Sequence, residues 1–158
     1  MKVPAFSLRA EAAEDEAFLR RLFVSGRHAE FAAAGLADAQ IEMLLAQQFN
    51  LQRSHYRAAY ADADWWVVEH RGEAVGRLYV ARAMDGRHLV DIALMPEWQG
   101  KGLGGALLDR VLADAAAAGR PVHLHVRPHN PARLLYLRKG FVETGLDGAD
   151  VAMTWKPR

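Results

Sequence analysis

Apolar residues in the first sixty positions recur at the spacing of an amphipathic helix. After a short strand at 6–11, this spacing predicts one helix over 14–34 and a second over 38–60, the latter with Asp38 as its N-cap. The apolar face of the first helix is Phe18, Leu19, Leu22 and Phe23, and that of the second is Ile41, Leu44, Leu45, Phe49 and Tyr56.

Between residues 64 and 95 the pattern changes to short apolar segments separated by tight-turn sequences. The turns are Arg71-Gly72 and Asp85-Gly86. Strands joined by such short connections pair antiparallel. The segment therefore predicts a three-stranded antiparallel meander.

Beyond Pro96 the chain alternates helices and strands. The first helix carries its apolar face on Leu103, Leu107, Leu108, Val111, Leu112 and Ala115. Gly119 is expected to end it, and the strand at 122–126 must then run parallel to the strand at 89–95, because a helix connects them. Asn130-Pro131 should begin a short helix that ends at Lys139-Gly140, before closing strands at 141–142 and 151–155.

This order of elements predicts a fold of the α/β class, in its α+β form. Its centre is one mixed, mainly antiparallel sheet with helices on both faces. A chain of 158 residues is long enough to bury a proper core, and we expect residues 1–158 to form a single domain.

Composition and charge narrow the function classes. The formal net charge of +1 provides no field to hold nucleic acid or an anionic membrane. The chain has no cysteine, which excludes thiolate metal sites and a cysteine nucleophile. It shows no leader-like start and nothing near the about 18 apolar residues of a membrane span. We therefore expect a cytoplasmic protein that binds neither nucleic acid nor membrane, and no metal site.

Four glycines cluster at the turn into the helix that begins near Leu103. Such a turn brings free N–H groups and the positive end of the helix dipole close to a phosphate. The sequence from Gly100 to Gly105 also satisfies the G-x-G-x-x-G dinucleotide pattern, but a Rossmann fold places that pattern after the first strand of a parallel sheet. Here a meander precedes it, so an NADPH-binding module is disfavoured. No G-K-[ST] follows, which argues against a P-loop.

Read as Gln99-x-x-Gly102-x-Gly104, the turn resembles the acetyl-CoA pyrophosphate loop of the GCN5-related N-acetyltransferase (GNAT) family. A second segment, from Asn130 through Ala132 and Tyr136 to Gly140-Phe141, is similar to the later signature of that family. Relatives often have two residues between the Asn and the Ala, where this chain has one, but the Ala-to-Tyr spacing is kept. The order of elements also matches.

The resemblance implies transfer of acetyl from acetyl-CoA to the primary amine of a small molecule, an amino acid or a peptide, by direct attack in a ternary complex. It implies that the strand at 89–95 separates from its parallel neighbour, so that backbone groups of Leu94 and Met95 face the thioester. The CoA contacts that it implies are Leu94, Met95, Gln99, Gly100, Lys101, Gly102, Leu103, Gly104, Gly105, Asn130, Arg133 and Tyr136. The alternative is a non-catalytic domain that binds and senses acyl-CoA.

Tyr136 is the candidate acid for the departing thiolate. His125 is a candidate general base, since some relatives carry a catalytic carboxylate at the matching place and an imidazole titrates near neutral pH. Asp91, Glu69, Glu97 and a water chain are the rival candidates. A histidine on a strand, and a tyrosine on a short helix, also have plain structural interpretations.

The resemblance places the acceptor between the first two helices. Gln48, Gln52 and Tyr56 follow one another along a polar and aromatic face of the second helix, and they are candidate substrate-binding residues. The same face could equally be a solvated helix edge. Relatives often form homodimers, so a possible homodimer is expected through a late strand or an exposed helix, and the sequence does not name the surface.

Overall fold

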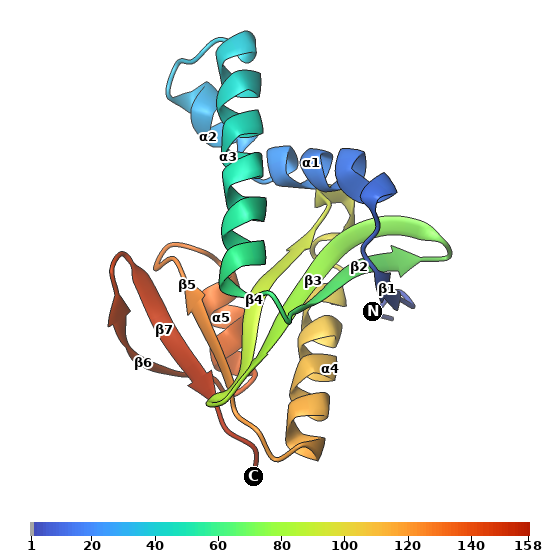
Figure 1. Ribbon diagram of the computed structural model, residues 1–158, viewed down its shortest axis with the longest axis vertical. Coiled ribbons are helices and arrows are strands. Elements are labelled where there is room, and N and C mark those ends of the chain that lie inside the picture. Colours follow the sequence, from blue (N-terminus) through green and yellow to red (C-terminus); the bar gives the residue numbers. More distant parts are fainter. Residues whose placement is uncertain (1) are drawn as a thin grey trace.

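The computed structural model describes residues 2–158 and contains one seven-stranded sheet, in the order β1-β2-β3-β4-β5-β7-β6 (Figure 1). The strands are β1 (Ser7–Ala10), β2 (Asp64–His70), β3 (Glu73–Ala83), β4 (Gly86–Leu94), β5 (Val122–Val126), β6 (Val142–Asp147) and β7 (Asp150–Trp155). The helices are α1 (Glu16–Ser25), α2 (His28–Ala33), α3 (Asp38–Ala59), α4 (Leu103–Ala117) and α5 (Ala132–Arg138), with 3₁₀ turns at Ala13–Asp15 and Pro96–Trp98.

The neighbouring strands are antiparallel except for β4 and β5, which are parallel. This confirms the predicted mixed sheet. Helices α1 and α3 cover one face, and α4 and α5 cover the other (Figure 1). Across residues 2–158, no helix is both long enough and apolar enough to cross a membrane.

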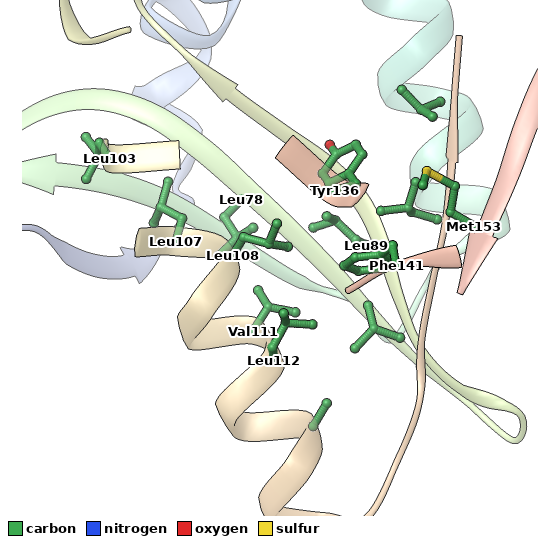
Figure 2. Close-up of a cluster of buried hydrophobic side chains, with 14 of the residues drawn as sticks. Leu78, Leu89, Leu103, Leu107, Leu108, Val111, Leu112, Tyr136, Phe141 and Met153 are labelled. Carbon is green, nitrogen blue, oxygen red and sulfur yellow. The ribbon is translucent and has the colours of Figure 1, made fainter. Parts of the chain in front are cut away.

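Each face of the sheet carries its own hydrophobic core. The core under α1 and α3 contains Phe18, Leu19, Leu22, Phe23, Ile41, Leu45, Phe49 and Val67. The larger core on the other face packs the apolar side of α4 against β3, β4 and β5, and it includes Tyr136 and Phe141 (Figure 2). The helical periodicities read from the sequence therefore identify most of the buried faces, but Leu44 of α3, predicted on the apolar face, is 37% exposed.

The helix predicted over 14–34 is not continuous, which corrects the sequence-based expectation. It begins with a 3₁₀ turn, and α1 ends at Ser25 and α2 starts at His28. Gly26 is the C-cap of α1, and Arg27 has φ −129° and ψ −20°, outside the helical range. The last buried residue of the apolar stripe is Phe23, and α2 adds only the partly buried Phe31 to this core. Packing therefore does little to hold this segment in line with α1 against the low helix propensity of glycine.

The parallel pair β4 and β5 separates after a short contact. Residue pairs join the strands only at Arg87 with Val122 and at His88 with His123. Beyond that point β4 stays paired with β3 as far as Leu94, and β5 stays paired with β7 as far as Val126. The two strands therefore splay apart, as the family resemblance implies, and leave an opening at the C-terminal end of β4.

The core on the α4 face should account for a large part of the stability. Leu108→Ala removes a fully buried side chain from α4 and should lower the free energy of unfolding by about 2 to 5 kcal/mol, because a cavity remains. Equilibrium chemical denaturation measures the change. The matched control is Leu146→Ala on β6, where the residue is 78% exposed and the expected change is below about 0.5 kcal/mol. Equal losses at the two positions would contradict this assignment of the core.

Candidate functional site

The opening between β4 and β5 exposes one backbone edge of β4. The Met95 N–H donates to the Val75 carbonyl across the β3 side (2.9 Å), and the Met95 carbonyl accepts from the Trp98 N–H (2.9 Å). Because backbone groups alternate along a strand, the N–H and carbonyl of Leu94 then point to the open side. The Leu94 carbonyl accepts a hydrogen bond from Gln99 Nε2 (2.9 Å). Of the two residues expected to line the opening, Leu94 turns its backbone toward it and Met95 does not.

The glycine turn lies directly after this edge and leads into α4. Gly100 and Gly102 have φ of 73° and 82°, in the region that favours glycine. Gly102 is the N-cap of α4, and the Ala106 N–H donates to its carbonyl (3.1 Å). The three preceding N–H groups, of Leu103, Gly104 and Gly105, have no carbonyl one turn earlier within the helix. They form a row of donors at the positive end of the helix dipole.

Gly104 and Gly105 are not required by packing inside the protein. A Cβ atom on Gly104 would lie 3.9 Å from Leu135 and 4.0 Å from Leu94, and one on Gly105 would lie 3.7 Å from Lys139. These are ordinary van der Waals distances, so alanine fits at both places. A ligand that approaches the N–H row closely explains two glycines there, and a phosphate group fits such a row.

The segment from Asn130 to Tyr136, which includes the start of α5, lies beside the glycine turn. Asn130 Oδ1 accepts the N–H of Ala132, the first residue of the helix (2.9 Å), but the N-cap of α5 is Pro131 and not Asn130 as the sequence predicted. Arg133 donates through Nε to Glu143 (2.6 Å) and through Nη1 to the Pro128 carbonyl (3.3 Å), which turns its guanidinium toward β6. Both side chains therefore already have partners within the protein.

Tyr136 is buried, with 7% of its surface exposed, and its ring packs against Phe141 (5.7 Å between centroids). Its hydroxyl points away from Phe141 (Figure 2). Burial, together with the smaller effect of the negative charge of Asp91, raises the pKa of Tyr136 to about 12. The phenol is therefore protonated at neutral pH, and Asp91 on β4 is near enough to influence it.

The structure separates the candidate bases. Glu69 accepts Arg9 Nε (2.9 Å) near the sheet edge, and Glu97 lies in the 3₁₀ turn before the glycines. His125 lies on the exposed face of β5, with Nε2 3.2 Å from Asp147. Asp91 is the candidate whose charge acts on Tyr136.

Asp91 forms an ion pair with Arg77, a side chain that the sequence analysis did not single out. Arg77 lies on β3, is only 2% exposed, and donates through Nε to Asp91 Oδ2 (2.6 Å) and through Nη2 to Gln52 (2.8 Å). Burial tends to lower the pKa of Arg77, but Asp91, Tyr79 and Tyr56 raise it by more. No hydrogen bond to Asp91 Oδ1 forms among residues 2–158, so this oxygen stays available to a ligand.

The residues expected on the acceptor side are only partly brought together. Gln52 contacts Arg77. The pKa of Tyr56 is raised to about 12, mainly by burial and next by the charge of Asp91, while Arg77 opposes the increase. Gln48 lies on the exposed part of α3. Asp91 therefore lies within electrostatic reach of two phenols, Tyr56 on α3 and Tyr136 on α5.

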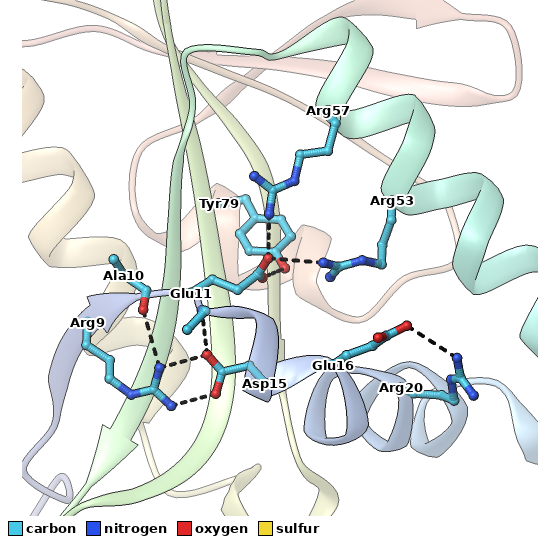
Figure 3. Close-up of polar contacts among 10 residues, drawn as sticks. Arg9, Ala10, Glu11, Asp15, Glu16, Arg20, Arg53, Arg57 and Tyr79 are labelled. Carbon is cyan, nitrogen blue, oxygen red and sulfur yellow. Dashed lines mark hydrogen bonds and ion pairs between the residues drawn. The ribbon is translucent and has the colours of Figure 1, made fainter.

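Glu11 carries a buried carboxylate that sequence reasoning missed. It directly follows β1, and only 2% of its side chain is exposed. It accepts hydrogen bonds from the Tyr79 hydroxyl, from Arg57 (2.6 Å) and from Arg53 (3.4 Å), which join β1, β3 and α3 (Figure 3). The only sequence signal was a glutamate at the end of a strand, which does not reveal partners more than forty residues away.

A family model described as acetyltransferase (GNAT) domain matches residues 61–143, just over half of the chain. The matched range runs from the meander through the splayed strands and the glycine turn to α5. The chain belongs to the GNAT family of acetyltransferases.

Solved structures resemble the whole chain. It is 19% identical to the PaiA N-acetyltransferase of Thermoplasma acidophilum in complex with coenzyme A, with a TM-score of 0.71 over 96% of this chain and 99% of that one. It is 22% identical to an acetyltransferase from Thermus thermophilus, with a TM-score of 0.68 over 99% of both chains. For a chimeric spermidine N-acetyltransferase from Vibrio cholerae the identity is 24% and the TM-score 0.66, over 96% and 95%. At these identities the likeness shows the fold.

Within the part of the chain that the structure describes, residues 2–158, no group of three or more His, Asp or Glu side chains is arranged to hold a metal ion.

The charge of Asp91 should be visible in the titration of the two phenols. Asp91→Asn should lower the pKa of Tyr136 and of Tyr56, because Asp91 raises both, but both should stay above 10.0, because burial is the larger cause. NMR of ring-labelled tyrosine measures each pKa, and the Tyr136→Phe and Tyr56→Phe variants assign the signals. Unchanged values in Asp91→Asn would contradict this placement of Asp91.

The same shifts set a sign for the pH dependence of stability. The folded-state pKa of each phenol, about 12, lies above the ordinary value of 10.0. The folded state therefore binds these protons more tightly, so their contribution is fully present below about pH 10 and declines as the pH rises toward 12.

Proposed function

We propose that this protein transfers an acetyl group from acetyl-CoA to a primary amine of a small molecule, an amino acid or a peptide, by direct attack in a ternary complex. One observation carries the proposal. The N–H row at the start of α4 directly follows the open edge of β4, at the end where β4 and β5 have separated. Membership of the acetyltransferase family supports the same reaction.

The residues of the glycine turn fit the pyrophosphate of CoA. The N–H groups of Leu103, Gly104 and Gly105 provide donors and the helix dipole favours negative charge. The Cβ-free positions at Gly104 and Gly105 leave room for close approach. Lys101, which lies over the Trp98 ring with Nζ 4.9 Å from its centroid, adds a positive charge beside the turn.

Acetyl-CoA supplies the acetyl group and a thiolate leaving group. The amine nitrogen forms the new bond to the acetyl carbon, the C–S bond breaks, and the excess proton of the amine passes to a base. With a pKa of about 12, the Tyr136 phenol is a weaker acid than a thiol. We therefore assign Tyr136 the role of a hydrogen-bond donor that stabilises the thiolate charge as it develops.

We assign to Asp91, rather than to His125, the role of the base that binds the amine and accepts its excess proton. Asp91 Oδ2 is held by Arg77, which fixes the carboxylate, and Oδ1 can accept an N–H of the amine directly or through water. His125 lies on the exposed face of β5 and is paired with Asp147. The Leu94 N–H, on the open edge of β4, is the donor we assign to the thioester oxygen.

Calorimetric titration tests the binding half of the proposal. The wild type should bind acetyl-CoA and CoA and should not bind NADPH. Gly104→Ala should weaken acetyl-CoA binding by about tenfold or more, because a methyl group then occupies the approach to the N–H row. It should not lower stability, because alanine fits there and is a better helix former.

The matched control is Gly26→Ala at the end of α1. Its Cβ would lie 3.8 Å from the Phe23 carbonyl, far from the glycine turn, so the affinity for acetyl-CoA should not change. Failure of the folded wild type to bind CoA would overturn the proposed function.

Tyr136→Phe tests the catalytic half. Loss of the hydroxyl should lower kcat by about 100-fold, because it removes a donor used as the thiolate charge develops. The dissociation constant of acetyl-CoA should change little, because the ring still packs on Phe141. Thiol release in the presence of an amine panel measures turnover, and calorimetry measures binding. A wild type that binds acetyl-CoA but turns over no amine would favour the acyl-CoA-sensing alternative.

A further inference from the structure

The break between α1 and α2 places Arg27 on the face of the sheet that α1 and α3 cover. This face, where the acceptor is expected, is called the acceptor side below. Its guanidinium carbon lies 3.9 Å from the centroid of the Phe23 ring. Phe23 in turn packs edge-on against Phe49 of α3 (5.7 Å). The cation therefore lies on the aromatic core under α3, where cation–π attraction holds it. The continuous helix predicted over 14–34 would have no turn after Gly26 to direct the Arg27 side chain onto this ring.

Arg27 is partly buried but makes no polar contact of its own. Among residues 2–158, its guanidinium forms no hydrogen bond and no ion pair within 4.0 Å. Burial lowers the pKa of Arg27, Asp91 raises it and Arg77 lowers it. Its charge is thus close enough to the Arg77–Asp91 pair to interact with it. A partly desolvated guanidinium without an anion is an unfavourable arrangement that a bound anion relieves.

The carboxylates of this region already have partners. Asp91 is paired with Arg77, and Glu11 binds both Arg53 and Arg57. Glu30 also acts on Arg27, but it is the weakest of the influences on its pKa. Four arginines thus face three carboxylates, so the acceptor side carries an excess of positive charge. An acceptor with several ammonium groups would be repelled there, whereas one with an oxyanion would be attracted.

We propose that Arg27 is a specificity-determining residue that binds the carboxylate or phosphate group of the acceptor, so that the preferred acceptor is an amine that also carries an oxyanion. This rests on the proposed function. Guanidinium binds such groups through two parallel hydrogen bonds. The contact with Phe23 holds the guanidinium over the ring, while its N–H groups bind no other residue among residues 2–158. The oxyanion binds Arg27, and the amine binds Asp91 Oδ1.

The test compares matched acceptors on the CoA-dependent reaction. The panel contains L-amino acids, their carboxamides, their decarboxylated amines, their α-aminophosphonate analogues and spermidine. In the wild type, kcat/KM should be at least about tenfold higher for an anionic member than for the neutral or cationic members of its set. A preference within the anionic members shows whether carboxylate or phosphonate is the better match.

Three variants isolate the role of Arg27. Arg27→Gln should remove the preference by raising KM for the anionic acceptors, with little change for the neutral ones. Arg27→Lys should keep part of the preference for anionic acceptors that Arg27→Gln loses, because lysine keeps the positive charge. Arg21→Gln is the matched control, since Arg21 is exposed on α1 and lies near Phe18, and it should behave as the wild type. Preference for neutral or polycationic amines, or equal behaviour of Arg27→Gln and Arg21→Gln, would overturn the inference.

Direct binding separates this inference from the proposed function. Calorimetric titration of the CoA-loaded protein with the same panel should show binding of anionic amines that Arg27→Gln weakens by at least about tenfold. Such binding without turnover of any amine would sink the proposed function and support the role of Arg27. Turnover without charge preference would overturn the role of Arg27 alone. Absence of both turnover and Arg27-dependent binding would overturn both.

Discussion

The separation of β4 from β5 after two residue pairs is the constraint on which the site depends. Each strand keeps its other neighbour, β3 for β4 and β7 for β5, so neither strand loses its place in the sheet. A free strand edge inside a protein must find other partners for its N–H and carbonyl groups. The Gln99 side chain supplies one, at the Leu94 carbonyl. The first residue of the glycine turn is therefore tied to the edge that the turn follows.

The ion pair between Arg77 and Asp91 organises the other side of the opening. A buried pair of this kind contributes little net stability, because desolvation of both charges offsets their attraction. The consequence of the pair is that it positions the Asp91 carboxylate. Arg77 also donates to Gln52 of α3, so the Asp91 carboxylate is fixed relative to both β4 and α3. Asp91 then influences the phenols of Tyr56 and Tyr136 at the same time. Tyr56 and Tyr136 lie on helices that are far apart in the sequence, and the charge of Asp91 raises the pKa of both phenols.

Much of the fold could be predicted from the sequence, because the two hydrophobic periods and the tight turns are local signals. The parallel β5 followed from the helix between it and β4, since such a connection requires it. The break at Gly26 could not be predicted, because an isolated glycine is compatible with a helix unless packing is known. Glu11 and Arg77 were missed for a related reason. Their roles arise from partners on other elements, and only the tertiary structure brings those partners close.

The same break determines where the charge of Arg27 lies. If α1 continued past Gly26, Arg27 would be a helical residue in line with α1 and α2. Ending the helix there lets the guanidinium turn back onto Phe23, beside a carboxylate that another arginine already neutralises. The charge selection that we propose thus rests on where α1 ends, at Gly26 after the last buried residue of its apolar stripe. Arg27 adds the unpaired charge, and the core beneath it sets the direction in which that charge is presented.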